Sequence, residues 1–375
     1  MRYIYQHIQT ITANYDGSLP LTHYLKQYFR QHPKLGSRDR KVLSQMAYCY
    51  YRTQKGLGLH LSFEETIQAA LLLCNSNEKY VQPFLPQDAV AMLHKAEFDI
   101  QRLFPYDITL SDGIAWQQWL ESMLVQPDMF IRTRVPLPVI TAILGANNIP
   151  HTRISDTCIA LPNGSPVDKL LPADSYVVQD ASSQYTGNYF HPKPKQQWWD
   201  CCSGAGGKSL LVKDKEPGIQ LTVSDKRATI LHNLQQRFKQ YHLPQPAAFV
   251  ADMTDTVSLA KEQGHKRYDN IICDVPCTGS GTWARTPEQL YFFSPHILDE
   301  INALQLQIAP NAATYLKPGG TFYYITCSVF QQENEAVVAH LLNSDNTLKL
   351  QEIQLINGLS LKADSMFIAI IKKED

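Results

Sequence analysis

The segment QQWWDCCSGAGGKS, residues 196–209, joins an apolar run, an acid and a glycine-rich loop, and it decides the predicted fold. The apolar residues before Asp200 predict a short buried strand. Glycines at positions 204, 206 and 207 allow the backbone to approach a ligand closely. A helix that starts just after the loop offers free N–H groups to the same ligand. The segment therefore predicts a strand, a ligand-binding loop and a helix.

The same alternation of strand, loop and helix extends from Tyr176 to the end of the chain. Short apolar runs recur between helical segments, namely IQLTVSD (219–225), AAFVAD (247–252), YDNIICD (268–274) and GTFYYITCS (320–328). Such alternation predicts a mostly parallel sheet with helices on both faces. Ligands of these sheets bind at the carboxyl ends of the strands. We therefore expect residues 176–375 to form an α/β, Rossmann-like catalytic domain.

Two further regions precede this domain. Residues 1–125 contain apolar residues at helical spacing, with Ser37 expected to cap one helix and Phe63–Cys74 forming another. The pattern changes near Gln126. There MFIRTRV (129–135) and HTRI (151–154) predict strands, and VITAILGANN (139–148) predicts a helix between them. The sequence thus predicts a helical domain over residues 1–125 and a small α/β unit over residues 126–175.

The composition excludes several classes of protein. The chain has 375 residues, of which 44% are hydrophobic and 18% charged, so a packed core is expected. No apolar run reaches the roughly 18–20 residues of a membrane helix, and the N-terminus lacks a secretion signal, so we expect a cytoplasmic protein without membrane contact. None of the eight cysteines forms a CxxC pair or has zinc spacing, so no metal is expected. Cys49, Cys74 and Cys158 are interpreted as buried structural thiols.

Positive charge is concentrated near the N-terminus, although the net charge of the chain is −1. Between Gly17 and Lys55 eight lysines and arginines accompany one acid, a local net charge of +7. A patch of this kind either contacts phosphates or is a solvated helix face. The positions proposed for nucleic-acid contact are Arg38, Arg40 and Lys41.

Acids at the strand ends indicate which cofactor the loop binds. The GKS tripeptide suggests a triphosphate loop, but that motif requires glycine at position 202, which is cysteine. Asp225 closes the strand after the loop, where an acid binds the ribose hydroxyls of an adenosine cofactor. Asp252 closes the next strand and is placed to meet an adenine amino group. Because the glycines of the loop lack the GxGxxG spacing of dinucleotide-binding proteins, these acids favour S-adenosylmethionine over NAD as the cofactor. The alternative interpretation is that each acid is a helix cap or a turn residue.

Two cysteines at strand ends indicate the reaction. Asp274, Pro276 and Cys277 follow one strand, where an enzyme that methylates an amino group would carry an Asn/Asp-Pro-Pro-aromatic turn. Cys327 ends another strand. A thiolate that adds to carbon 6 of cytosine makes carbon 5 able to attack a methyl sulfonium. Hydrogen bonding at ring nitrogen 3 assists the addition, and a base then removes the proton on carbon 5. The alternative is a pair of buried structural thiols.

These residues resemble the RNA 5-methylcytosine methyltransferases of the NOL1/NOP2/Sun family, over roughly residues 126–375. The family's loop D-x-C-A-A-P-G-G-K-T corresponds to residues 200–209, with Gly204 and Ala205 in place of Ala and Pro. Its D-x-P-C-[ST] and T-C-S motifs correspond to residues 274–278 and 326–328, and Glu333-Asn334 matches its E-N. VVQDASSQ (177–184) and MFIAIIKK (366–373) match the segment before the loop and the closing strand.

The resemblance implies a role for each site residue. Cys327 is implied as the nucleophile, Cys277 as the residue that assists release of the methylated base, and Asp274 as the group at ring nitrogen 3. The residues implied to hold S-adenosylmethionine are Cys202, Ser203, Gly204, Ala205, Gly206, Gly207, Lys208, Asp225, Asp252 and Asp274.

The N-terminal segment GSRDRKVLSQMAYCYYR (36–52) resembles the NusB-type helical domain of bacterial members that modify small-subunit rRNA. RNA is therefore the expected partner, with rRNA favoured over tRNA. Residues 1–125 are interpreted as a NusB-like RNA-binding domain and residues 126–175 as a small RNA-binding unit, and the basic patch is expected to contact the RNA. Three alternatives stay open: a tRNA substrate, Cys277 as nucleophile as in DNA cytosine-5 methyltransferases, and a non-catalytic RNA-binding or ribosome assembly factor that has kept the fold. The oligomeric state cannot be predicted from the sequence.

Overall fold

The computed structural model describes residues 2–76 and 78–375, which divide into two compact units. The helical unit comprises Met1–Ile108, Ala115–Gln126 and Thr282–Pro295. The sheet unit comprises Thr109–Ile114, Pro127–Gly281 and His296–Asp375. Among the described residues, no helix combines the length and the apolar character that crossing a bilayer requires.

The helical unit confirms the helical character predicted for the N-terminal region. Apolar residues on successive turns, such as Ile4, Ile8 and Ile11, pack with those of neighbouring helices into one buried core. A carboxylate oxygen of Glu288 accepts the first N–H of α2, that of Leu21, at 3.0 Å, so a distant segment of the chain satisfies this helix end. The helices are α1 (Arg2–Asn14), α2 (Leu21–Gln31), α3 (Ser37–Thr53), α4 (Phe63–Leu73), α5 (Ala89–Ala96), α6 (Trp116–Ser122) and α13 (Pro287–Phe292).

Two details of this unit differ from the prediction. Ser37 is the first residue of α3 and not its cap, because Gly36 is the cap and its N–H donates to Asp39 at 3.2 Å. Arg52 does not belong to the basic surface. Its guanidinium is buried and donates to the carbonyl of Met123 at 2.7 Å and to Gln126 at 2.8 Å. Arg52 therefore stabilises the core of the unit, and the basic patch of residues 17–55 exposes one positive charge fewer than the sequence suggests.

The sheet unit begins with a small antiparallel sheet of strand order β2-β3-β1-β4. The strands are β1 (Met129–Thr133), β2 (Thr152–Arg153), β3 (Cys158–Leu161) and β4 (Tyr176–Val178), and the helices are α7 (Leu137–Ala146) and α8 (Val167–Leu170). The predicted strand, helix and strand are confirmed. The fourth strand lies beyond residue 175, where the sequence analysis ended the small unit.

The larger sheet has seven strands in the order β10-β11-β9-β8-β5-β6-β7. The five strands from β9 to β7 are parallel, while β11 pairs antiparallel with β9 and β10 pairs antiparallel with β11. This confirms the predicted Rossmann-like sheet. The strands are β5 (Gln197–Asp200), β6 (Gln220–Asp225), β7 (Ala247–Val250), β8 (Tyr268–Asp274), β9 (Leu316–Thr326), β10 (Leu348–Ile356) and β11 (Met366–Lys373).

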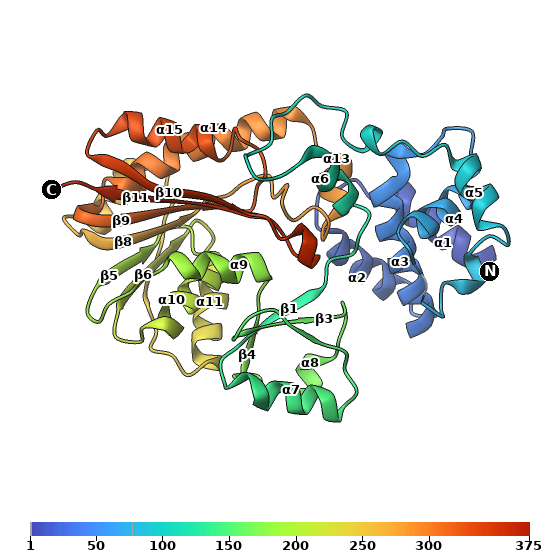
Figure 1. The fold of residues 1–375 in the computed structure, drawn as a ribbon, viewed down its shortest axis with the longest axis horizontal. Helices are drawn as coiled ribbons and strands as arrows, with labels where there is room; N and C mark the ends of the chain where they lie inside the picture. The colour runs from blue at the N-terminus through green and yellow to red at the C-terminus, as the bar shows by residue number, and fades with distance from the viewer. Residues whose placement is uncertain (1, 77) are drawn as a thin grey trace. The chain divides into compact units, whose positions relative to one another are not determined.

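Helices cover both faces of this sheet, as Figure 1 shows for α14 and α15 above it and α10 and α11 below it. Successive residues of β5 point to opposite faces of the sheet. Trp199 therefore packs in the core between the sheet and α14, and Trp198 packs in the core between the sheet and α10. The α-helices that accompany the larger sheet are α9 (Ala181–Tyr185), α10 (Gly207–Lys215), α11 (Ala228–Gln240), α12 (Thr256–Gln263), α14 (Pro295–Ala313) and α15 (Glu335–Ser344).

Candidate active site

The carboxyl ends of four neighbouring parallel strands carry the polar residues that the sequence singled out. Asp225 ends β6, Asp200 ends β5, Asp274 ends β8, and Cys327 directly follows β9. The strands are in register there, since Asp200 pairs with both Val223 and Ile272 and Asp274 pairs with Ile325. The sheet therefore brings residues more than one hundred positions apart in the sequence to one edge.

The glycine-rich loop between β5 and α10 has a backbone shape that requires glycine. Gly204 and Gly206 have φ values of +51° and +82°, a region that other residues rarely adopt. A Cβ added at Gly206 would also lie 2.8 Å from the Leu234 side chain. At Gly204 and Gly207, by contrast, an added Cβ would meet nothing within 4 Å. The loop thus combines a tight turn with open space over two of its glycines, at the N-terminus of a helix.

Buried polar atoms beside this loop fit a polar cofactor. Asp200 accepts a hydrogen bond from Ser209 through one oxygen at 2.6 Å, while its other oxygen is buried with no partner among the described residues. The Ser203 hydroxyl is likewise buried and unpaired among those residues. Burial raises the pKa of Asp200 to about 7, so this carboxyl takes up a proton near neutrality. Donors and acceptors of this kind suit the amino, carboxyl and hydroxyl groups of S-adenosylmethionine.

Asp225 joins the second strand end to the loop. One of its oxygens accepts the N–H of Gly204 at 3.0 Å, and the other accepts the N–H of Arg227 at 2.9 Å. The side chain is almost fully buried. Asp225 therefore shapes the loop directly, in addition to any bond that it makes to a ribose.

Lys208 links the first turn of α10 to the end of β8. Its amino group lies 3.3 Å from a carboxylate oxygen of Asp274 and donates to the Ser183 hydroxyl at 2.8 Å. Only 6% of the Lys208 side chain is exposed, compared with 30% of that of Asp274. The lysine therefore orients a carboxylate that remains accessible to a substrate.

Cys277 and Cys327 lie side by side, with their sulfur atoms 3.2 Å apart. The N–H of Cys327 also donates to the sulfur of Cys277 at 3.3 Å. The adjacent thiol of Cys327, together with burial, raises the pKa of Cys277 well above its usual range. Cys277 therefore stays protonated near neutral pH.

The buried carboxylate of Glu333 holds together the two loops that carry these cysteines. One oxygen accepts the N–H of Thr278 at 2.7 Å and the amide of Gln305 at 3.1 Å. The other accepts the hydroxyls of Thr278 and Ser328. Burial raises the pKa of Glu333, and its four donors favour the charged form. Because Thr278 and Ser328 each directly follow a cysteine, Glu333 fixes the separation of the two sulfur atoms.

Gly281 allows these loops to approach each other. Its N–H donates to the carbonyl of Cys327 at 2.9 Å. A Cβ at this position would lie 2.3 Å from the carbonyl oxygen of Ser365 and 2.9 Å from that of Cys327. Only glycine is compatible with backbones this close.

The remaining predicted residues lie outside this group. Asp252 follows the edge strand β7, and its carboxylate binds the N–H of Thr254 at 3.0 Å and Lys226 at 2.7 Å. Lys226 lowers the pKa of Asp252 to about 2. Arg38, Arg40 and Lys41 are exposed on the first turn of α3, in the helical unit. Among residues 2–76 and 78–375, no group of His, Cys, Asp and Glu side chains is arranged to hold a metal ion.

Sequence reasoning gave no role to several residues that build the site. Glu333 was matched to a motif without a function, and Gln305 lies within α14 with no local signal. The need for a small residue at Gly281 had a local signal, because three of the five residues from Cys277 to Gly281 are glycine or serine, a composition typical of loops. Cys49 and Cys158 are buried as predicted, and Cys74 is partly buried in the same core as Cys49.

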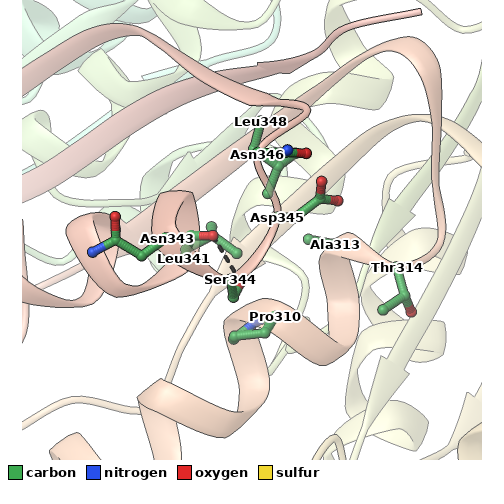
Figure 2. Close-up of a pocket in the computed structure, with 9 residues that line it drawn as sticks. All are labelled: Pro310, Ala313, Thr314, Leu341, Asn343, Ser344, Asp345, Asn346 and Leu348. Atoms are coloured by element: carbon green, nitrogen blue, oxygen red, sulfur yellow. Dashed lines mark hydrogen bonds between the residues drawn. The ribbon is translucent and has the colours of Figure 1, made fainter.

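A separate pocket of about 530 Å³ lies at the opposite edge of the sheet (Figure 2). It is lined by the end of α14, the end of α15 and the turn before β10, with Asn343, Asp345 and Asn346 among its residues. Strand β9 separates this edge from Cys327: its residues Leu316 and Ile325 pair with Tyr268 and Asp274 of β8, which are six positions apart, roughly 20 Å at about 3.3 Å per residue. The pocket therefore has no access to the two thiols.

Comparison with known proteins agrees with this site. Residues 188–372 match the family described as 16S rRNA methyltransferase RsmB/F. The segment of residues 188–372 belongs to this family. RsmB/F proteins are S-adenosylmethionine-dependent RNA methyltransferases, so the predicted enzyme class, cofactor and family are confirmed. The resemblance of the N-terminal segment to a NusB-type domain stays a prediction.

Several curated relatives carry the name ribosomal RNA small subunit methyltransferase B. The protein from Shewanella oneidensis is 30% identical over 47% of this chain and 40% of its own length. This alignment thus spans less than half of that RsmB/F relative. The protein from Klebsiella pneumoniae strain 342 is 26% identical over 76% of this chain and 68% of its own. The crystal structure of PH0851 covers 94% of this chain and 95% of that one, with a TM-score of 0.72 and 17% identity, and it supports the fold.

Proposed function

We propose that this RsmB/F protein transfers a methyl group from S-adenosylmethionine to carbon 5 of cytosine in rRNA, through a covalent bond between Cys327 and the base. The observation that carries the proposal is the pair of cysteines, whose sulfur atoms lie 3.2 Å apart at the strand ends that also carry the glycine loop. A methyltransferase that acts on an amino group has no use for two adjacent thiols.

The glycine loop, Lys208 and Asp225 are the residues proposed to hold the cofactor, with Asp252 as a further contact at the adenine. When bound, S-adenosylmethionine supplies an electrophilic methyl group. The open space over Gly204 and Gly207 and the free N–H groups at the start of α10 support this assignment. The ion pair with Lys226 makes Asp252 the weakest member of the set.

Cys327 is the proposed nucleophile. Its thiolate adds to carbon 6 of cytosine, and carbon 5 then carries enough electron density to accept the methyl group. The Asp274 carboxyl group, oriented by Lys208, is proposed to bind at ring nitrogen 3 and stabilise the adduct. Loss of the proton from carbon 5 then restores the ring and breaks the bond between sulfur and carbon.

Cys277 is proposed to assist the departure of Cys327. A protonated thiol 3.2 Å from the leaving sulfur donates a hydrogen bond to the thiolate as it forms. The raised pKa of Cys277, which the adjacent Cys327 thiol and burial cause, suits a thiol that acts as a hydrogen-bond donor.

The helical unit is proposed to bind RNA as a NusB-like domain. Arg38, Arg40 and Lys41 are exposed at the start of α3, where a positive charge is disfavoured by the helix dipole. The names of the relatives make small-subunit rRNA the favoured substrate.

The test is methyl transfer from radiolabelled S-adenosylmethionine to purified 16S rRNA and, in a separate reaction, to purified tRNA, both lacking modifications, followed by digestion to nucleosides. We expect the label in 5-methylcytidine. Label in another nucleoside would refute the reaction, label on tRNA alone would refute the substrate, and cofactor binding without transfer to either RNA would favour a non-catalytic factor.

A further inference from the structure

A second pocket of the sheet unit, of about 300 Å³, lies between the small sheet and helix α10. Its lining includes Arg132, Thr133 and Arg134 from β1 and the residue that follows it, and Asp214 and Lys215 from the end of α10. It opens toward solvent beside the exposed residue Thr157. The site proposed for methyl transfer uses none of these side chains.

The pocket has an excess of positive charge, because three cations face one carboxylate. Asp214 is shared by two guanidinium groups, with Arg132 at 2.8 Å and Arg134 at 2.9 Å. The amino group of Lys215 donates to the main-chain carbonyls of Gly187 and Phe190, which leave its charge uncompensated. The lining therefore has a net charge of +2, and an anion is the ligand that balances it.

Two buried donors at this pocket have no partner among the described residues. They are the second terminal nitrogen of Arg132 and the hydroxyl of Thr133. Both residues are more than nine-tenths buried. The other guanidinium nitrogens of Arg132 are used, one by Asp214 and one by Gln179 at 3.1 Å. A buried donor without an acceptor destabilises the fold, so these two groups indicate that an acceptor binds from outside the chain.

We propose that this pocket binds a backbone phosphate of the RNA substrate, with Arg132, Thr133 and Lys215 as its ligands. A phosphodiester supplies several acceptor oxygens and one negative charge, which suits a guanidinium nitrogen, a hydroxyl and an ammonium held together. The inference rests on the proposed function, since it takes the anion to be part of RNA. It places an RNA contact on the small sheet, in the same compact unit as the two cysteines.

The test compares RNA affinity at several salt concentrations for Thr133→Val, Arg132→Gln and the control Arg153→Gln. Thr133→Val removes the hydroxyl, keeps the shape and changes no charge. We expect it to weaken binding about tenfold, the loss of one hydrogen bond to a charged group, without lowering the thermal stability of the free protein. Arg132→Gln should also lower the salt slope by about one unit. Arg153 is an exposed cation on the same sheet, outside the pocket lining, so its removal should affect affinity less than either change.

Inorganic phosphate tests the pocket without RNA. At constant ionic strength, phosphate in place of chloride should raise the thermal midpoint of the wild type more than that of Thr133→Val. Equal midpoint shifts together with unchanged RNA affinity in both variants would overturn the proposal. A phosphate effect confined to the wild type, with RNA affinity unchanged in both variants, would mean that the pocket takes a free anion, which overturns the assignment to RNA.

These outcomes are separable from the fate of the proposed function. If the wild type transfers no methyl group but Thr133→Val still weakens RNA binding, the phosphate pocket stands and the proposed reaction fails. If methyl transfer proceeds and Thr133→Val binds RNA like the wild type, the reaction stands and the pocket fails. If Arg132→Gln does not fold, Thr133→Val decides the question, because it leaves the ion pairs of Asp214 intact.

Discussion

Replacing Glu333 with alanine removes the acceptor of four buried hydrogen bonds that join the two cysteine loops. The hydroxyls of Thr278 and Ser328 can rotate toward other acceptors, and Gln305 keeps a bond to the Pro276 carbonyl at 2.8 Å. The N–H of Thr278 cannot rotate, so it bears the largest loss. One lost buried acceptor and the small cavity together predict a destabilisation of about 2–4 kcal/mol.

The same change should slow catalysis, because the loops set the distance between the two sulfur atoms. A misplacement of about 1 Å lowers a rate by roughly 100-fold, so we expect a loss of that order in kcat. Glu333→Gln is the matched control. Its amide oxygen keeps the two N–H donors and its amide nitrogen donates to the two hydroxyls, so stability should change by less than about 1 kcal/mol.

Urea denaturation and single-turnover methyl transfer measure these two effects. Wild-type stability and kcat in Glu333→Ala would refute the positioning role. An equal loss of kcat in Glu333→Gln, at wild-type stability, would instead make Glu333 a proton-transfer group.

Three further predictions follow from the strand ends and the basic helix. Asp225→Ala should weaken cofactor binding by roughly 1–3 kcal/mol in calorimetry, and an unchanged dissociation constant would reduce Asp225 to a turn residue. Burial raises the pKa of Asp200 in the folded protein to about 7, so the stability that its protonated form contributes is full below about pH 4 and is lost as the pH rises through 7. Without cofactor, the free energy of unfolding of Asp200→Asn should therefore increase relative to that of the wild type between pH 5 and 8. A difference that stays constant over this range would contradict the prediction. Reversing the charges of Arg38, Arg40 and Lys41 should weaken RNA binding and flatten its salt dependence by up to about one unit per lost phosphate contact, whereas an unchanged slope would make this stretch a solvated face.

The sequence predicted those parts of the site that local patterns encode. Glycines at positions 204 and 206 mark a loop with positive φ, and the apolar run before Asp200 marks the strand that feeds it. The position of Cys327 at a strand end followed from the run that precedes it. Each of these signals lies within about ten residues, where backbone geometry and side-chain alternation are sufficient.

Long-range contacts were beyond the reach of the same reasoning. Glu333 and Thr278 are 55 positions apart, and nothing near either residue indicates that they meet. Arg52 was counted with the basic surface because its charge alone does not reveal that its guanidinium is buried and donates to the carbonyl of Met123 and the side-chain oxygen of Gln126. The unpaired donors of Arg132 and Thr133 likewise cannot be identified from the sequence, because they depend on how β1 packs near α10.

The most direct test of the central claim is a denaturing gel of cysteine variants incubated with RNA and S-adenosylmethionine. If Cys327 attacks the base and Cys277 assists its release, Cys277→Ala should stall after methyl transfer and give a slowly migrating, RNase-sensitive band. Cys327→Ala and the double variant should give none, because the bond requires Cys327. A band in Cys327→Ala and none in Cys277→Ala would make Cys277 the nucleophile and contradict the account.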